Sequence, residues 1–236
     1  MSIKVVLFDL DGTLLPIDQS EFIKQYFKGL VTCAAMHGYD IEAAKAALSQ
    51  GIKYIATNDG SRSGEVAFWD GFCEVIGEER SVLEGYFEKF YQNDFDKLIS
   101  LARPTEKARA TVEAVKALGL RVVLATSPYF PRVATYKRVR WAGFEPTDFE
   151  LVTTYENSCH AKPAIEYYSD LAKTLGVAPE ECLMVGNDAF EDMIAENIGM
   201  KVSLMPDCLI NSKDIDISKY PQGDFDALTD FVKTLI

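Results

Sequence analysis

Two aspartates, Asp9 and Asp11, stand two positions apart at the end of a short apolar run. Gly12 follows them, and a glycine lets the backbone turn sharply enough for the Asp11 carboxylate to approach that of Asp9. Two carboxylates this close repel each other unless a cation or a shared proton lies between them. The spacing is therefore typical of a cation-binding acidic pair, and acidic turn residues that merely cap a strand end remain the alternative.

Polar side chains follow two later segments in a similar way. Thr126 and Ser127 end a second hydrophobic run, where hydroxyls and backbone N–H groups can bind phosphate oxygens or simply cap the next turn. Lys162 precedes Pro163, the expected first residue of a helix. A cation at a helix N-terminus opposes the helix dipole, which favours a lysine that faces an anion over one that only aids solubility.

A second acidic pair, Asp188 and Asp192, follows a third apolar run. Residues four apart share one face of a helix, so the two carboxylates point the same way. Acidic residues in a first helical turn also complement the dipole without further function. As hard oxygen ligands near Asp9 and Asp11, they would complete a site for Mg²⁺, which takes one or two carboxylates with carbonyl, water and substrate oxygens.

The elements that carry these side chains alternate between strand and helix. Strands are predicted at 5–8, 120–125, 149–152, 182–185 and 201–204, with helices at 105–118, 131–141, 163–175 and 190–198. Such alternation predicts an α/β fold with a Rossmann-like parallel sheet. Open α/β sheets place their chemistry at the carboxyl ends of the strands, so all of these polar groups should meet there.

The region between the first strand and residue 101 reads instead as successive helices. Ser20, Asp40 and Ser63 are candidate N-caps, and apolar residues recur at helical spacing after each, with aromatic residues among them after Ser20 and Ser63. These stripes predict a helical bundle core, in which some rings could face a substrate. We therefore expect a discontinuous core domain, 1–16 with 103–236, and a helical cap domain at 17–102 that lies over the catalytic end.

Composition narrows the possible partners. A net charge of −12 argues against nucleic acids and anionic membrane surfaces. No apolar run is long enough to span a bilayer, and no signal-peptide pattern is present, so a cytoplasmic protein is expected. Five scattered cysteines and two histidines suggest neither a zinc site nor a disulfide framework. The choice between monomer and homodimer stays open.

Four motifs in this order resemble those of the haloacid dehalogenase superfamily. They are D-x-D-G-T at Asp9–Thr13, the strand-end Thr126, the pair Lys162-Pro163, and G-N-D-x-x-x-D at Gly186–Asp192. The helical insert resembles the cap of members whose cap lies between the first two motifs. Asn187 departs from the commonest fourth motif, and we expect Asp188 rather than Asn187 to meet the metal.

The resemblance implies a role for each matched residue. Asp9 would be the nucleophile that forms an aspartyl-phosphate, and Asp11 the general acid and base. Thr126 and Lys162 would stabilise the transferring group, and Thr13 would orient an aspartate. The phosphate would contact Leu10, Thr126, Ser127 and Lys162. Mg²⁺ would be held by Asp9, Asp11 through its backbone carbonyl, Asp188 and, directly or through water, Asp192.

The activity implied is that of a Mg²⁺-dependent phosphatase acting on a small phosphorylated metabolite. A phosphosugar mutase of the same family would use similar residues. A dehalogenase is disfavoured because attack at carbon needs no acid such as Asp11 for a halide. A phosphonatase would want a special cap lysine, which nothing in the sequence marks. A non-catalytic binding protein on this scaffold is a further alternative.

Overall fold

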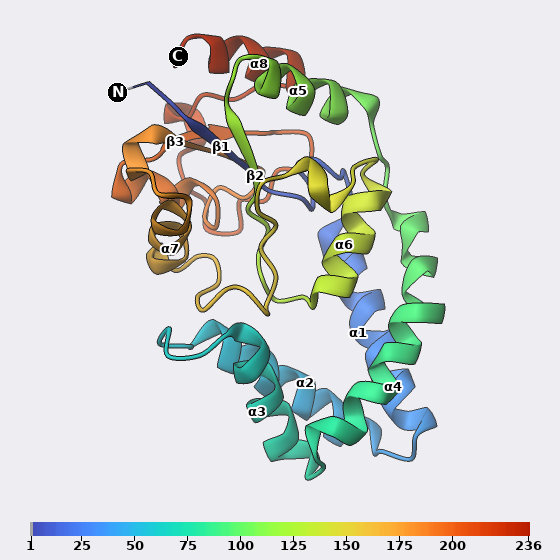
Figure 1. Ribbon diagram of the computed structural model, residues 1–236. Helices are drawn as coiled ribbons and strands as arrows, with labels where there is room; N and C mark the ends of the chain where they lie inside the picture. Colours follow the sequence, from blue (N-terminus) through green and yellow to red (C-terminus); the bar gives the residue numbers. More distant parts are fainter. Residues whose placement is uncertain (1) are drawn as a thin grey trace.

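A four-stranded parallel sheet forms the centre of the computed structural model, which describes residues 2–236 (Figure 1). The strand order is β2-β1-β3-β4, and β1 pairs in register with both neighbours, so that Val5 lies opposite Arg121 and Cys182. The strands are β1 Val5–Phe8, β2 Arg121–Leu124, β3 Cys182–Gly186 and β4 Lys201–Leu204. This arrangement confirms the predicted α/β class.

Alternate side chains of β1 enter two different hydrophobic clusters, one on each face of the sheet. Val6 and Phe8 belong to a cluster shared with α5 and α8, whereas Val5 and Leu7 belong to a cluster shared with α7. A strand buried on both faces needs apolar side chains at every position, which explains its unbroken hydrophobic run. The helices are α5 Glu106–Ala117, α7 Ile165–Leu175 and α8 Phe225–Lys233.

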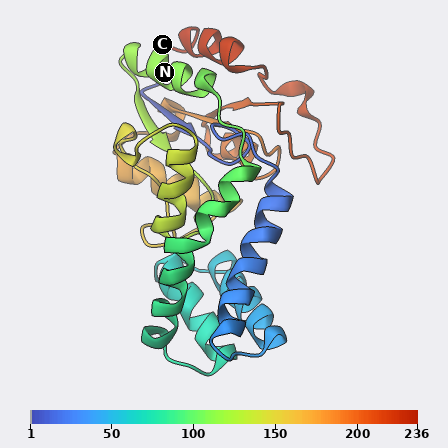
Figure 2. The ribbon, with the colours of Figure 1, turned by 90° about the vertical axis from the view of Figure 1, so that its right-hand side faces the viewer.

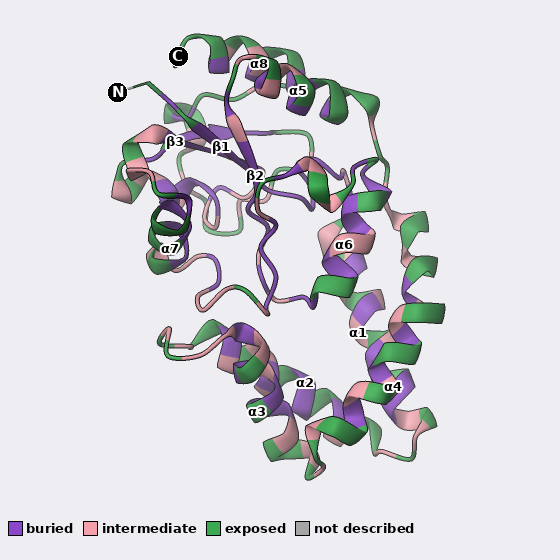
Figure 3. Ribbon diagram, viewed as in Figure 1, coloured by how far each residue is buried: buried purple, intermediate pink, exposed green. Residues whose placement is uncertain are grey.

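Four further helices form a separate layer beyond the carboxyl ends of the strands (Figures 1 and 2). They are α1 Gln19–Met36, α2 Ile41–Ala56, α3 Gly64–Ile76 and α4 Arg80–Asn93, and α4 continues into the 3-10 helix η1 Phe95–Leu101. Their buried faces turn toward one another (Figure 3). Helix α6, Arg132–Trp141, joins the two regions, since Trp141 stacks on Phe95 of η1 at a ring separation of 5.1 Å.

The chain crosses between the sheet region and the helical layer at two adjacent points. Ile17 forms an antiparallel bridge with Ala102, and the Arg103 N–H donates to the Pro16 carbonyl at 2.8 Å. We propose that core and cap divide at this pair of crossings, as the sequence predicts.

A second contact fastens the far side of the helical layer to the sheet region. At the start of α3, the N–H groups of Gly64 and Glu65 donate to the carbonyls of Ser158 and Tyr155 at 2.8 and 2.7 Å. The Asn58 side chain donates to the Cys159 carbonyl at 2.6 Å. The helical layer is thus held at both ends in this structure.

Several element boundaries differ from those predicted. Helix α1 begins at Gln19 rather than after Ser20, because Asp18 accepts the Glu21 N–H at 3.0 Å and serves as the N-cap. Helix α7 begins two residues after Pro163. The strand expected at 149–152 is reduced to one bridge between Leu124 and Val152. The helix expected at 190–198 is a turn followed by a 3-10 helix.

The remaining short elements are all 3-10 helices. They are η2 Pro146–Asp148, η3 Pro179–Glu181, η4 Met193–Ile198 and η5 Ile217–Lys219. None of the helices described over residues 2–236 is long and apolar enough to cross a membrane.

Candidate active site

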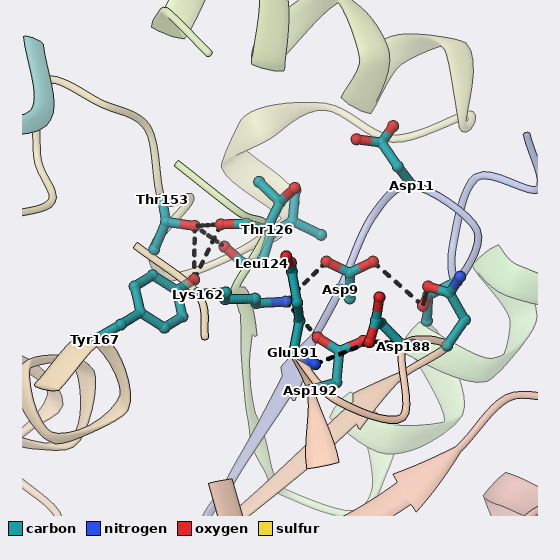
Figure 4. A network of polar contacts seen from close by, with 12 residues as sticks. Asp9, Asp11, Leu124, Thr126, Thr153, Lys162, Tyr167, Asp188, Glu191 and Asp192 are labelled. Atoms are coloured by element: carbon teal, nitrogen blue, oxygen red, sulfur yellow. Dashed lines mark hydrogen bonds and ion pairs between the residues drawn. The ribbon is translucent and has the colours of Figure 1, made fainter. Parts of the chain in front are cut away.

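Asp9 lies at the carboxyl end of β1, where the Lys162 side chain reaches it (Figure 4). The Asp9 N–H donates to the Val185 carbonyl at 2.9 Å, which continues the pairing with β3 by one residue. Lys162 Nζ donates to Asp9 Oδ1 at 2.9 Å and to Asp192 Oδ1 at 2.6 Å. The lysine therefore bridges two of the predicted acidic residues, and all three are at most 6% exposed.

Burial and ion pairing act in opposite directions on Asp9 and on Lys162. Burial raises the pKa of Asp9 to about 7, against the opposing effect of the Lys162 charge. Burial alone would lower the pKa of Lys162, but the carboxylates of Asp192 and Asp9 outweigh it and raise that pKa well above its ordinary value. Lys162 is thus a fixed cation that favours the ionised form of Asp9.

Asp11 points away from Asp9 and toward α6 (Figure 4). Its carboxylate forms an ion pair with Arg138, which is fully buried and lies over the Phe130 ring at 4.0 Å from its centroid. Burial raises the pKa of Asp11, and the Arg138 charge opposes that shift. The Asp11 carbonyl accepts a hydrogen bond from Gln19 of α1.

Arg138 and Gln19 were not predicted as site residues. The available signal for Arg138 was its place one turn after Ala134 on the buried face of α6, where an arginine needs an anionic partner.

Asn187 joins the loop after β3 to the loop after β1. Its Oδ1 accepts the Thr13 hydroxyl at 3.0 Å, and its Nδ2 donates to the Cys208 carbonyl at 2.7 Å. Gly12 packs against this amide at a φ of +88°, and a Cβ there would lie 2.3 Å from Nδ2. Both ends of the Asn187 amide are therefore engaged, which is consistent with Asp188 as the residue left for a metal.

The second acidic pair divides into two environments. Asp188 lines the cavity, and its Oδ1 accepts the N–H groups of Phe190 and Glu191, each at 2.8 Å. Asp192 instead accepts the Asp188 N–H at 2.9 Å with the oxygen that Lys162 leaves free. A Cβ at Gly186 would lie 2.0 Å from Asp192 Oδ2, so the glycine makes room for this carboxylate.

The loop after β2 carries the predicted phosphate-binding hydroxyls. The Thr126 carbonyl accepts the hydroxyls of Thr153 and Tyr167 at 2.6 and 3.0 Å, which fix the loop (Figure 4). The Ser127 hydroxyl is buried without a hydrogen-bond partner among the described residues, and it lines the same cavity as Asp9. A buried hydroxyl in this state suits a ligand oxygen.

Leu10 lies between the two motif aspartates and is fully buried. Its carbonyl accepts the N–H groups of Thr13 and Leu15, which shapes the turn after β1.

One cavity of about 400 Å³ connects these groups to the helical layer. Polar side chains of the strand ends line one part of it, and the rest is lined by side chains of α1–α4 and by the segment 129–131 and Tyr155 of the sheet region. The residues of the polar part include Asp9, Asp11, Asp188, Thr126 and Ser127. The structure therefore brings the residues at the predicted strand ends together in one cavity, and the helical insert covers this cavity.

The cavity floor has an excess of negative charge that a divalent cation would relieve. No three His, Cys, Asp or Glu side chains within residues 2–236 are grouped so that they could hold a metal by themselves. Mg²⁺ commonly uses only one or two carboxylates together with carbonyl and substrate oxygens, so this donor set fits it. Two cations, Lys162 and Arg138, pair with carboxylates at this floor. The acidic lining residues outnumber them and are Asp9, Asp11, Asp188, Glu191 and Asp192.

Comparisons with known proteins find relatives along most of the chain. Residues 3–195 match the family described as haloacid dehalogenase-like hydrolase. The chain is 28% identical over 206 residues to a putative phosphatase, YhcW, of Bacillus subtilis, covering 86% of this chain and 84% of that one. It is 27% identical over 241 residues to a glyceraldehyde 3-phosphate phosphatase of Methanocaldococcus jannaschii, covering 99% and 98%.

Solved structures share the fold at lower identity. A phosphatase from Thermococcus onnurineus aligns with a TM-score of 0.60 at 18% identity and covers 98% of both chains. A putative β-phosphoglucomutase from Thermotoga maritima aligns with a TM-score of 0.58 at 19% identity, covering 99% of this chain and 100% of that one. These likenesses extend over the sheet region and the helical layer together.

Proposed function

The chain belongs to the haloacid dehalogenase-like hydrolases, and from this premise we propose that it hydrolyses a small phosphomonoester through an aspartyl-phosphate on Asp9. The observation that carries the proposal is the Asp9 carboxylate at the floor of a closed-in cavity, with one oxygen held by Lys162 at 2.9 Å. That contact leaves Oδ2, which accepts the Thr13 hydroxyl at 3.4 Å, to attack phosphorus in line with the leaving oxygen.

Asp11 supplies and recovers the proton. As the Asp9–phosphorus bond forms, the ester P–O bond breaks and the alcohol oxygen takes a proton from Asp11. A water molecule then gives a proton to Asp11 and attacks phosphorus, which releases phosphate and restores Asp9. Burial raises the pKa of Asp11, which favours the protonated acid for the first step. The side chain must leave Arg138 to reach the leaving oxygen.

Lys162, Thr126 and Ser127 would bind the phosphoryl oxygens beside Asp9, together with the backbone at Leu10. Donors fixed before the reaction stabilise charge that develops in the transition state. Asp192 has its carboxylate on Lys162 and on backbone, so we propose that it acts by positioning the lysine.

The residues that would hold Mg²⁺ are Asp9 and Asp188 through their carboxylates and Asp11 through its carbonyl, with Asp192 behind them. Bound there, the ion neutralises charge on the phosphoryl oxygens. This chain's own part is to keep hard oxygen donors on one side of the phosphoryl site and the hydroxyls of Thr126 and Ser127 on the other.

The decisive experiment compares Asp9→Asn with Asp230→Asn, a matched substitution at an exposed residue of α8. With Mg²⁺ present, a panel of phosphomonoesters should yield phosphate with the parent and with Asp230→Asn, and none above background with Asp9→Asn. Borohydride quenching of the parent during turnover should convert Asp9 to homoserine, detected by mass spectrometry. Parent-level phosphate release by Asp9→Asn would overturn the proposal.

A further inference from the structure

The cavity above Asp9 continues well beyond the phosphoryl site. Its volume of about 400 Å³ lies in the range of small-molecule pockets, and a phosphoryl group fills only its floor. The remainder is enclosed by α1–α4 together with Tyr129, Phe130, Pro131 and Tyr155 of the sheet region, so the leaving group of the phosphomonoester must occupy that part. The chemistry of those walls therefore describes the alcohol that the enzyme releases.

The walls on the helical side are hydrocarbon. Apart from Gln19, every lining residue contributed by α1–α4 is aliphatic or aromatic. Two of them, Tyr26 and Tyr91, carry hydroxyls, but these lie 2.7 Å apart and hydrogen-bond each other. On the sheet side, Tyr129 and Tyr155 also carry hydroxyls, and that of Tyr129 donates to the Lys162 carbonyl at 3.5 Å. A polyol would have to give up its water for few free partners, which costs affinity. The walls include Phe22, Leu30, Leu48, Ile52, Phe68 and Phe87.

One polar group on this side has no partner. Trp69 Nε1 is buried without a hydrogen bond of good geometry among the described residues, although the Tyr155 hydroxyl lies close to it, and both residues line the cavity. A single acceptor atom on a mainly apolar ligand would satisfy it. The lining thus accommodates one polar atom in the leaving group but not a row of hydroxyls.

The charged side chains of the lining are also confined to the part of the cavity around the phosphoryl site. Within residues 2–236, the lining contains no Lys, Arg or His side chain, and its charged members are the acidic residues around the phosphoryl site. A carboxylate or second phosphate on the leaving group would be desolvated among α1–α4 with no counter-charge. A bisphosphate intermediate, as a phosphosugar mutase requires, meets the same obstacle.

We propose, on the basis of the phosphatase function argued above, that the substrate is the phosphomonoester of an uncharged, predominantly hydrocarbon alcohol. The phosphoryl group lies on Asp9 and the hydrocarbon part lies between α1 and α4. The reaction is the one described above, in which the P–O bond breaks and the apolar alcohol leaves with the proton from Asp11.

A homologous series of n-alkyl phosphates, from ethyl to hexyl, tests the hydrocarbon part. All release primary alcohols, so their intrinsic reactivities are similar and differences in kcat/KM report on the pocket. Each added methylene should raise kcat/KM by up to about fourfold until the cavity is full. Hexyl phosphate should exceed glycerol 3-phosphate by about tenfold or more. A flat series, or a preference for glycerol 3-phosphate, overturns the inference.

Two matched pairs test charge at nearly constant shape. In 3,3-dimethylbutyl phosphate and phosphocholine, a quaternary carbon replaces a quaternary nitrogen. Hexyl phosphate and 6-phosphonooxyhexanoate differ by a terminal carboxylate. In each pair the uncharged member should be favoured by about tenfold or more in kcat/KM. A preference for phosphocholine would contradict the inference, because it would mean that the aromatic walls bind a cation. A preference for 6-phosphonooxyhexanoate would also contradict it, because it would mean that an unrecognised cation in the helical layer binds the carboxylate.

A charge placed in the wall should reverse the second preference. Ile52 of α2 lines the cavity and is only half-buried, so Ile52→Lys can be accommodated, and Ile52→Met is its uncharged control. Ile52→Lys should lower kcat/KM for hexyl phosphate and raise it for 6-phosphonooxyhexanoate, whereas Ile52→Met should keep the parent's order. Equal effects of Ile52→Lys on both substrates would contradict the assignment of this wall to the leaving group.

A binding measurement separates this inference from the proposed function. Hexyl phosphate titrated into Asp9→Asn by calorimetry should bind with a negative heat capacity change, the marker of apolar burial. Phosphate release from glycerol 3-phosphate but not from hexyl phosphate would leave the phosphatase standing and overturn the apolar substrate class. Binding of hexyl phosphate without hydrolysis of any phosphomonoester by the parent would overturn the phosphatase and leave the apolar pocket standing.

Discussion

Asp11 and Arg138 form a buried ion pair in the site that the sequence did not predict. Arg138 has no exposed surface, and Asp11 Oδ1 has no hydrogen-bond partner among the described residues. Removing one member of a buried ion pair leaves an uncompensated charge, whereas removing both does not. The pair thus holds the proposed acid, Asp11, against α6, and both charged side chains lose hydration by being buried there.

We expect Arg138→Met to lower the free energy of unfolding by about 3 kcal/mol, because it leaves the Asp11 carboxylate buried without its cation. Adding Asp11→Asn to Arg138→Met should recover part of that loss. Urea unfolding of the parent, both single variants and the double variant gives the coupling energy. Strictly additive effects would mean that the two side chains do not depend on each other.

Metal binding can be observed apart from turnover. Mg²⁺ that binds only the folded protein raises the free energy of unfolding by RT ln(1 + c/Kd), where c is the free Mg²⁺ concentration, and the unfolding temperature rises with it. We expect this rise in the parent and in Glu166→Gln, whose exposed residue lies at the start of α7, and not in Asp188→Asn. An undiminished rise in Asp188→Asn would remove that residue from the metal site.

Individual site residues were predictable from the sequence where they belong to a motif with a fixed order along the chain. They were less predictable where only tertiary packing brings them to the site. As expected from the predicted strand ends, one cavity is lined or approached by four motif residues, Asp9, Thr126, Lys162 and Asp188. Arg138 belongs to no motif, and its role depends on α6 folding back over the turn after β1. That long-range contact leaves no local signal beyond an arginine on an apolar face.

At the scale of elements, β1 and β3 were predictable because each is a continuous apolar run between turn residues. Asp40 and Ser63 cap α2 and α3 as predicted. Helix α8 was missed, although Asp224 caps it and its apolar residues recur at helical spacing. The segment at 149–152 has strand composition, but it lies at the outer edge of β2, where only one bridge forms.

The turn between β3 and η4 depends on the absence of a side chain at Gly186. Gly186→Ala should push Asp192 away from Lys162 and lower kcat at least tenfold, with a loss of about 2 kcal/mol in the free energy of unfolding. Gly85→Ala is the control, because a Cβ in that part of α4 meets nothing within 4 Å. Helix propensity predicts that Gly85→Ala raises stability by about 0.5–1 kcal/mol. Normal activity in Gly186→Ala would show that the contact can relax.

At the scale of the whole molecule, the net charge of −12 opposes the approach of a phosphate dianion. Salt screens this repulsion over a Debye length of about 10 Å at 0.1 M. With Mg²⁺ saturating, kcat/KM for a phosphomonoester should therefore rise by roughly two- to fivefold between low salt and 0.15 M NaCl. A fall over this range would point to a local positive field at the entrance that outweighs the global charge.

The bridge between Ile17 and Ala102 bears on how such a protein can diversify. Since the chain departs from the core and returns to it at neighbouring backbone positions, a replacement for residues 18–101 needs only to begin and end side by side. The conformational entropy cost of closing the core across that short gap grows only slowly with the length of the inserted segment, by about 0.6 kcal/mol for each doubling. The same sheet region can therefore carry many different inserted segments. Substrate selectivity then lies in a segment that recombination can exchange while the sheet stays constant.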